Sequence, residues 1–127
     1  QRDLPELPDN VRVVEFAPLH ALLPTCSAVV HHGGWGTVCS ASYAGTPQVI
    51  LPQQLDAPFM ADRIAGAGAG LSLPPARALD VGEAVSRLLS EEGFARGAER
   101  LRADMAAMPA PNDVVPEIER LVEHHRP

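Results

Sequence analysis

The chain has 127 residues, of which 46% are hydrophobic and 20% are charged, and its formal net charge at pH 7 is -6. This length suits one modest domain, and the composition is typical of a globular fold rather than of a disordered chain. The acidic balance excludes a broad nucleic-acid surface, which needs a basic stripe, and no apolar run approaches the roughly 20 residues of a membrane span. We therefore expect no nucleic-acid binding and no membrane-spanning helix, and any anion must be bound at a local site.

The basic and sulfur-containing residues exclude further kinds of site. All ten basic residues are arginine, so a Walker-type phosphate loop and Schiff-base chemistry, which both need lysine, are excluded. Cys26 and Cys39 form no C-x-x-C motif and are expected to be buried thiols rather than a disulfide. No signal peptide is recognisable, and together with this cysteine usage that indicates the cytoplasm.

The first part of the chain predicts one strand and one short helix. Residues 1–10, with Pro5 and Pro8 among charged residues, are expected to be an extended lead-in. Residues 10–16 alternate valine with polar residues and predict a strand, and residues 18–26 predict a short helix or turn. Because this is a poor domain start, we expect the chain to begin inside a domain.

The middle of the chain alternates strands and helices. Residues 27–30 and 48–51 are short apolar runs, typical of strands that are buried on both faces. The helix expected between them, residues 35–44, ends at Gly45 with Pro47 just beyond it. A strand, a helix and a second strand in this order indicate a parallel sheet with a right-handed crossover.

The remaining elements complete a layered fold. A helix at residues 57–65 and a short strand at residues 71–73 come next, and Asp80 is a candidate N-cap for the helix after them. Because no long linker separates strands from helices, we predict a single α/β domain, a Rossmann-like parallel sheet flanked by helices with a helical C-terminal portion. The three amphipathic C-terminal helices are expected at residues 79–89, 94–108 and 114–125.

The segment between the first buried strand and its helix predicts an anion site. It reads H-H-G-G-W-G-T, and Gly33, Gly34 and Gly36 allow positive φ and close approach of the backbone. The free N–H groups of the following helix face this loop, which suits a phosphate group. His32 can donate a ring N–H to a phosphate oxygen, and Thr37 can add its hydroxyl.

Several alternatives concern the same segment. A lone histidine at a strand end is more often satisfied by backbone groups, but the glycine context favours a ligand role for His32. Adjacent strand residues point to opposite faces, so His31 and His32 cannot easily share a metal ion, and His31 is expected to pack or to give hydrogen-bond support. Trp35 is expected to pack in the core. Cys39 stands where a dinucleotide fingerprint needs glycine, which argues against an NAD site.

The motif that begins at His32 resembles the His-x-Gly-x-x-Ser/Thr signature of nucleotide-sugar glycosyltransferases with two facing Rossmann-like domains, the GT-B fold. The doubled histidine and glycine resemble family 1 (UDP-glycosyltransferase-like) bacterial enzymes that put sugars on macrolides, other polyketides and further natural products. Residues 13–19, 44–48 and 52–56 fall in the order and spacing of that family, and the resemblance covers about residues 11–73. It implies that the chain is the C-terminal, donor-binding half of such an enzyme.

The resemblance also implies a role for each residue of the donor site. Asp56 has a second, structural interpretation as the N-cap of the helix that follows it, and the two roles are compatible. The phosphates are implied to contact His32, Gly33, Gly34, Gly36 and Thr37. The other implied contacts are Phe16 and Ala17 with the nucleobase, Ser40 with the ribose, and Asp56 and Ala57 with the donor sugar.

Two of these positions depart from the family pattern. Ser40 stands where enzymes that use UDP-sugars commonly have a glutamate that holds both ribose hydroxyls. Ala57 stands where a glutamine or asparagine usually contacts the sugar. A deoxyribose nucleotide and a deoxygenated sugar lose least from these changes, so a dTDP-deoxysugar is favoured over UDP-glucose.

The resemblance places the rest of the chemistry elsewhere. In this family the acceptor pocket and the catalytic base belong to an N-terminal acceptor domain, so we assign no catalytic residue here and expect nucleotide binding without turnover. Neither a metal nor another cofactor is expected. The implied partners are the nucleotide-sugar donor, the acceptor domain and a small-molecule aglycone, with self-association or an auxiliary protein as further possibilities.

Two other classes of function stay open. The chain could be a non-catalytic nucleotide-diphosphate-binding module that works with a separate partner. It could also belong to a UDP-sugar enzyme of another type, although residues 16–19 and 45–48 argue against that class.

Overall fold

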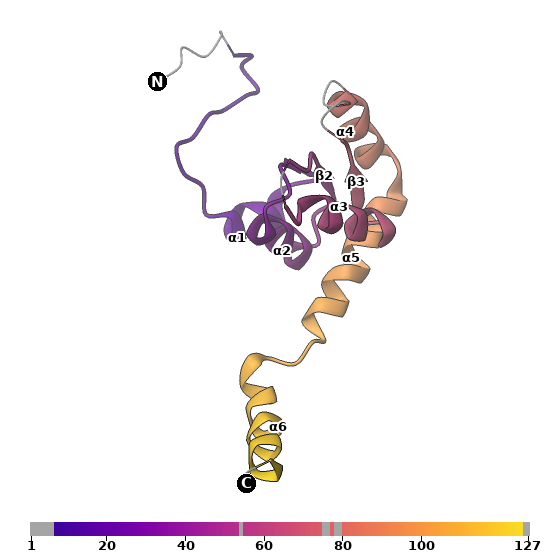
Figure 1. The fold of residues 1–127 in the computed structure, drawn as a ribbon. Helices are drawn as coiled ribbons and strands as arrows, with labels where there is room; N and C mark the ends of the chain where they lie inside the picture. Colours follow the sequence, from indigo (N-terminus) through magenta and orange to yellow (C-terminus); the bar gives the residue numbers. More distant parts are fainter. Residues whose placement is uncertain (1–6, 54, 75–76, 78–79, 126–127) are drawn as a thin grey trace.

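The described part of the chain forms a three-stranded parallel sheet with helices on both faces (Figure 1). The computed structural model describes residues 7–53, 55–74, 77 and 80–125. The strands lie in the order β1-β2-β3, with Val30 beside Val49 and Val49 beside Leu71. The predicted α/β class and the predicted parallel sheet are confirmed. The strands are β1 (Val29–His31), β2 (Gln48–Ile50) and β3 (Gly70–Ser72).

Each predicted helix is present, with its ends shifted by at most a few residues. Gly45 ends the second helix as expected: its φ is 70°, and its N–H bonds to the carbonyl oxygen of Ser42 at 3.1 Å. Residues 1–6 of the expected lead-in and the expected helix start at Leu79 lie outside the described residues. The helices are α1 (Leu19–Leu22), the 3-10 turn η1 (Leu23–Thr25), α2 (Trp35–Ala44), α3 (Ala57–Gly66), α4 (Val81–Ser90), α5 (Glu92–Ala106) and α6 (Pro111–His124).

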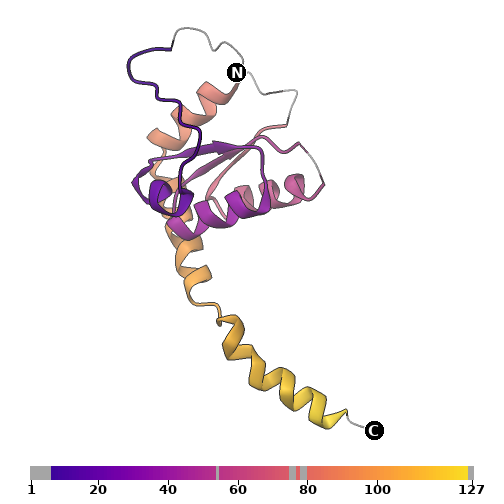
Figure 2. The same ribbon diagram turned by 90° about the vertical axis from the view of Figure 1, so that its left-hand side faces the viewer.

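The sheet separates two hydrophobic cores. Val49 and Ile50 are consecutive residues of the central strand β2, so they point to opposite faces, and both are fully buried. Ile50 packs with side chains of α2, α3 and α5, whereas Val49 packs with Leu73 and with Ala84 and Leu88 of α4. In Figure 2, α4 lies on one side of the sheet and α2 and α3 lie on the other. Burial on both faces explains why Val49 and Ile50 are both apolar.

Helix α5 crosses very close to the backbone that leads into β3. A Cβ at position 97 would overlap the carbonyl group of Gly68 and would lie 3.1 Å from the amide nitrogen of Ala69. The next residue, Ala98, is buried in the core on the same side of the sheet. The absence of a side chain at Gly97 therefore sets the distance between α5 and the sheet.

The predicted short helix before β1 is present as α1 and η1, and one buried hydrogen bond joins it to the sheet. Leu23 is 1% exposed and Thr46 is 2% exposed. The Thr46 hydroxyl donates to the carbonyl oxygen of Leu23 at 2.8 Å. This bond satisfies a polar group that would otherwise be buried without a partner.

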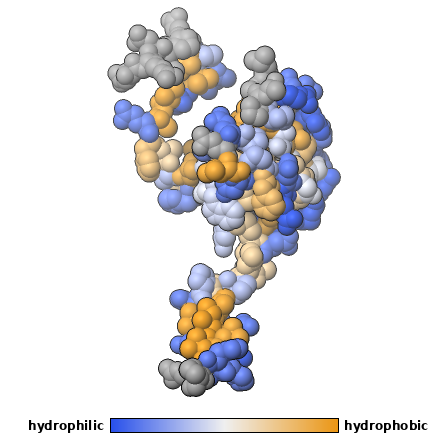
Figure 3. All heavy atoms as spheres, in the orientation of Figure 1, coloured by the Kyte–Doolittle hydropathy of each residue, from blue (hydrophilic) through white to orange (hydrophobic). Residues whose placement is uncertain are grey.

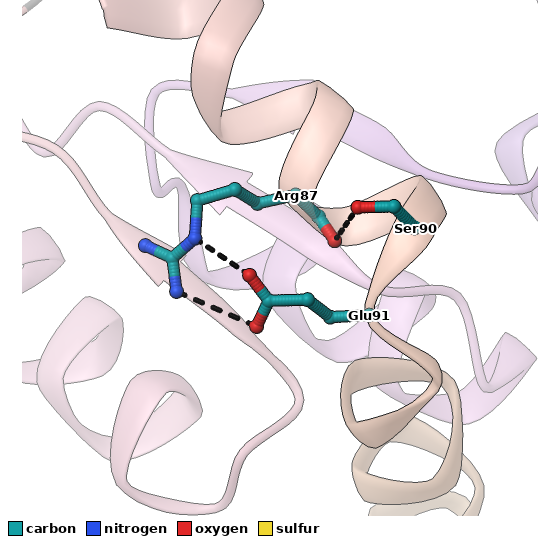
Figure 4. A network of polar contacts seen from close by, with 3 residues as sticks. All are labelled: Arg87, Ser90 and Glu91. Carbon is teal, nitrogen blue, oxygen red and sulfur yellow. Dashed lines mark hydrogen bonds and ion pairs between the residues drawn. The ribbon is translucent and has the colours of Figure 1, made fainter.

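An exposed ion pair joins the last turn of α4 to Glu91, the residue between α4 and α5 (Figure 4). Arg87 Nε donates to Glu91 Oε1 at 2.8 Å, and the hydroxyl of Ser90 donates to the Arg87 carbonyl oxygen at 3.4 Å. The bond from Arg87 holds the pKa of Glu91 below its usual value. Because both side chains are about half exposed, this pair contributes little to stability.

The start of α4 differs in detail from the sequence prediction. Asp80 occupies the N-cap position, but its carboxylate makes no capping hydrogen bond. It accepts instead a hydrogen bond of 2.7 Å from Arg77 Nε. The capping role predicted for Asp80 is therefore wrong, because the charged guanidinium competes for the same oxygen.

The strand predicted at residues 10–16 is absent. Val13, Val14 and Phe16 are 62%, 64% and 83% exposed, and none of residues 10–16 is in a strand. A strand needs a neighbour for its N–H and C=O groups, and within the described residues β1 pairs with β2 alone. The alternating valines satisfy the local pattern of a strand, but in the described residues they pair with no edge of the sheet.

Helix α6 extends away from the sheet and its flanking helices in both ribbon views (Figures 1 and 2). It buries none of its residues. Figure 3 shows hydrophobic side chains gathered on one side of it, and the exposed fractions of Val115, Ile118, Leu121 and Val122 lie between 44% and 57%. Across the described residues, no helix has both the length and the hydrophobicity that crossing a bilayer requires.

Candidate functional site

The loop between β1 and α2 folds tightly against the start of α3. Gly33 has a φ of 91°, a region that favours glycine. A Cβ there would lie 2.9 Å from the Ala57 Cβ and 3.0 Å from the Ile50 Cγ2. The β1–α2 and β2–α3 loops therefore meet at the carboxyl ends of the strands, which is where open parallel sheets bind ligands.

Helix α2 begins directly after this loop and leaves backbone N–H groups free. Gly34 is the N-cap residue, and its carbonyl oxygen accepts the N–H groups of Thr37 and Val38, both at 3.0 Å. In the described part of the chain, no backbone acceptor bonds the N–H groups of Gly34, Trp35 or Gly36. These amides and the positive end of the helix dipole suit a negatively charged group.

His32 lies beside these amides. Its side chain is exposed, and its ring covers Gly34, because a Cβ on Gly34 would lie 2.8 Å from His32 Nε2. The imidazole therefore lies against Gly34, the first of the three residues with a free amide. Thr37, in the first turn of α2, is half-buried.

A hollow of about 350 Å³ lies between the two loops. One loop contributes His32, Gly33 and Gly34, and the other contributes residues 53 and 55–57. Asp56 is the N-cap residue of α3, but its carboxylate makes no capping hydrogen bond. The capping interpretation is therefore wrong for the side chain, which leaves the carboxylate available to a ligand in the hollow.

Two further residues line the hollow, Gln53 and Leu55, and the sequence motifs assign no ligand contact to either. Gln53 and Leu55 belong to the segment that carries the family resemblance, yet neither type signals a ligand contact by itself. Leu55 has a φ of 50° and is 96% exposed, a conformation that its residue type does not announce. Ala57 lines the hollow but is only 4% exposed, since its methyl group packs under Gly33.

The residues predicted for the nucleoside lie outside this hollow. Ser40 donates its hydroxyl to the Gly36 carbonyl oxygen at 2.8 Å, and it lines a second hollow of about 350 Å³ between α1 and α2. Phe16 is exposed, and neither it nor Ala17 lines either hollow. The β1–α2 and β2–α3 loops therefore meet at the hollow, whereas Phe16 and Ala17 do not reach it.

The prediction that Trp35 packs in the core is wrong. Its side chain is 60% exposed and lines an outer groove of about 640 Å³ together with Met60, Leu101 and Met105. Trp35 is the first residue of α2, and the side of the helix that faces the sheet is occupied by Val38 and Ala41.

The two histidines lie in different surroundings, as predicted. His31 Nε2 lies 2.9 Å from Gln48 Oε1, while His32 lines the hollow. Burial lowers the pKa of His31 below its ordinary value of 6.5, although the bond to Gln48 acts in the opposite direction. Among the described residues, no group of three or more His, Cys, Asp or Glu side chains could hold a metal ion.

Comparison with known proteins decides the family. Residues 1–121 match the family model described as "Erythromycin biosynthesis protein CIII-like, C-terminal domain". The chain belongs to this family. The predicted resemblance to natural-product glycosyltransferases is confirmed, and so is the predicted fold class, because the solved structures similar to this CIII-like domain are GT-B glycosyltransferases.

Two curated relatives of this CIII-like domain are themselves named as sugar transferases. Tylactone mycaminosyltransferase from Streptomyces fradiae is 48% identical over 123 residues, which are 95% of this chain and 27% of that protein. TDP-daunosamine transferase DnrS from Streptomyces peucetius is 47% identical over 127 residues, 97% of this chain and 30% of that protein.

Solved structures show the same partial coverage. Spinosyn forosaminyltransferase SpnP has a TM-score of 0.88 and 43% identity, covering 97% of this chain and 34% of that one. Glycosyltransferase VinC in complex with dTDP has a TM-score of 0.86 and 41% identity, covering 94% and 31%. The CIII-like domain thus spans about a third or less of the length of the relatives it matches.

Proposed function

We propose that this chain is the donor-binding domain of an inverting glycosyltransferase that transfers a deoxysugar from dTDP to a hydroxyl group of a natural-product aglycone. The observation that carries the proposal is the single hollow in which His32, the β1–α2 loop and the unbonded Asp56 carboxylate meet. The names of the relatives support the substrate class, since they include a TDP-daunosamine transferase and VinC in complex with dTDP.

The loop supplies stabilisation of the leaving group. Negative charge grows on the β-phosphate when the bond to the sugar breaks, and preorganised donors that face this charge lower the barrier. His32 and the free N–H groups of Gly34, Trp35 and Gly36 are such donors, and the hydroxyl of Thr37 adds another. These groups bind the diphosphate without a metal ion.

The second loop holds the sugar. Asp56 accepts hydrogen bonds from sugar hydroxyls, for which its uncapped carboxylate is free. Ala57 offers only a largely buried methyl group in place of a polar contact. A donor sugar with fewer hydroxyls loses least in this setting, which favours a deoxysugar.

The nucleoside end lies toward α1 and α2. Ser40 contacts the ribose, and Phe16 and Ala17 contact the base once their segment is brought to the site. The aglycone and the catalytic base belong to an acceptor domain in the larger part of a longer protein, as the length of the relatives suggests. Such an enzyme works in the cytoplasm, in keeping with the free thiols of Cys26 and Cys39.

Calorimetric titration of this chain with dTDP, UDP and NAD tests the proposal. We expect dTDP to bind, UDP to bind more weakly and NAD to give no heat of binding. Tighter binding of UDP would remove the preference for dTDP. Binding of NAD in place of both diphosphates would contradict a nucleotide-sugar site altogether.

The variant Ser40→Glu is expected to raise the ratio of UDP affinity to dTDP affinity about tenfold. A carboxylate at this position of α2 can accept hydrogen bonds from both ribose hydroxyls of UDP, and dTDP has only one of them. Competitive titration of UDP against dTDP measures the ratio. Ser40→Gln is the matched control, with similar size and no charge, and an unchanged ratio in Ser40→Glu would place the ribose elsewhere.

A further inference from the structure

His31 links the phosphate loop to the interior of the sheet. Its Nδ1 lies 3.1 Å from the amide nitrogen of Gly33, and its Nε2 lies 2.9 Å from Gln48 Oε1. Gln48 is fully buried in the central strand, and its Nε2 donates to Ser42 Oγ at 3.0 Å. A continuous chain of hydrogen bonds therefore runs from α2 through β2 and β1 to the loop.

The groups in this series of hydrogen bonds determine which atom donates and which accepts in each bond. The Gly33 N–H can only donate, so His31 Nδ1 must carry a lone pair. The carbonyl oxygen of Val38, 3.5 Å from Gln48 Nε2, can only accept, which turns the Gln48 amide so that its oxygen faces His31. His31 must then donate from Nε2, and the ring is the neutral tautomer with its proton on that nitrogen.

We propose that neutral His31 is a positioning residue that holds the phosphate loop in its binding conformation. Its Nδ1 takes the Gly33 N–H, and on the other side of the loop Gly33 packs against Ala57 and Ile50. With Gly33 fixed between these contacts, the following amides of Gly34, Trp35 and Gly36 stay free for a diphosphate. The identity of the ligand, a diphosphate, rests on the proposed function. The hydrogen bond between Gly33 and His31 does not depend on a ligand.

Protonation of His31 would release the loop, because an imidazolium has no lone pair to accept the Gly33 N–H. Gln48, which faces the ring from β2, carries no charge, and neither does Ser42, the α2 residue bonded to Gln48. Among the described titratable groups, the charge of His32 acts on it, and burial and this charge both lower its pKa. The neutral state of His31 therefore persists to a lower pH than in an ordinary histidine, and the hold on Gly33 is lost as the pH falls through the lowered pKa of the folded protein.

The tautomer can be read directly from the chain without ligand. Long-range 1H–15N correlation spectra at pH 7.5 are expected to show His31 with an unprotonated Nδ1 and a protonated Nε2. Amide exchange at Gly33 is expected to be slow. The opposite tautomer, or an imidazolium at this pH, would overturn the proposal.

Two variants separate a positioning role from a merely structural one. His31→Asn keeps an acceptor close to the position of Nδ1, whereas His31→Gln keeps a partner for Gln48 but leaves the Gly33 N–H unbonded. We expect His31→Asn to retain dTDP affinity within about threefold and His31→Gln to lose about tenfold, with matching acceleration of Gly33 amide exchange. Equal affinity and equal exchange in the two variants would overturn the proposal.

The pH profile gives a third readout. When the pH is lowered from 7.5 through the range in which the same spectra show His31 taking up a proton, the affinity of the wild-type chain for dTDP is expected to fall relative to that of His31→Asn, since asparagine does not titrate and every other titratable group is present in both proteins. A constant ratio across the range in which His31 becomes protonated contradicts the role of His31. Failure of the wild-type chain to bind dTDP at any pH argues against the proposed function instead, and Gly33 exchange in the two variants then still decides the role of His31.

Discussion

Replacing Gly97 with alanine is expected to lower the free energy of unfolding by about 3 kcal/mol. The new Cβ would overlap the carbonyl group of Gly68, which is backbone and cannot turn away, so α5 must shift outward from the turn that leads into β3. Ala98 moves with the helix, and this opens the core that it shares with Ile50. The gain in helix propensity from glycine to alanine, about 1 kcal/mol, does not offset the clash. Urea denaturation followed by circular dichroism measures the difference.

A matched control exists in the same helix. A Cβ at Gly93 would meet no atom within 4 Å, so Gly93→Ala is expected to leave stability unchanged or to raise it slightly. The comparison isolates the steric effect because both variants make the same chemical change in α5. If the two variants were equally stable, the close approach at Gly97 would not determine the packing of α5.

In the longer glycosyltransferase proposed above, the variant His32→Ala is expected to reduce kcat about a hundredfold, and in this chain it is expected to weaken dTDP binding about tenfold. The imidazole is the side-chain donor that lies against Gly34 at the start of α2, and the charge it meets is larger in the transition state than in the bound donor. The rate is therefore expected to suffer more than the affinity. Transfer assays on the full-length protein and calorimetry on this chain measure the two effects.

His124→Ala serves as the histidine control for this experiment. His124 is exposed on α6 and lines none of the hollows described above. Its removal is expected to leave dTDP affinity and kcat unchanged. Loss of transfer in both variants would point to a general effect on folding, and retention of transfer in His32→Ala would move the leaving-group role to the backbone alone.

Elements with a strong local signal were predictable from the sequence. Helix α2 was bounded correctly at both ends because glycines flank it, and Gly45 adopts the left-handed conformation that ends helices. Strand β2 is recognisable in the sequence because it is an apolar run bounded by prolines, as expected of a strand that is buried on both faces. Residues 10–16 carried an equally good strand pattern, but a strand also depends on a neighbour, and pairing is not written in the local sequence.

The site was predictable where its chemistry depends on residue type, and less so where it depends on conformation. The sequence alone predicts an anion site at the glycine loop with His32 as a donor. In the structure, Gly33, Gly34 and His32 line one hollow together with Asp56. The position of Leu55 in that hollow follows from a φ of 50°, which leucine does not signal. The bond from Gly33 to His31 depends on a ring orientation that only the folded sheet determines.

The stability of α6 depends on whether its exposed apolar side chains are buried against another surface. An isolated helix of about 14 residues is marginal in water, and Pro116 removes one of its internal hydrogen bonds. Local bonds such as that from the Ala110 amide to Asp113 Oδ2 help only its first turn. Any surface that buried Val115, Ile118 and Leu121 would therefore also stabilise the helix itself, because ordering of α6 and burial of these side chains would be coupled.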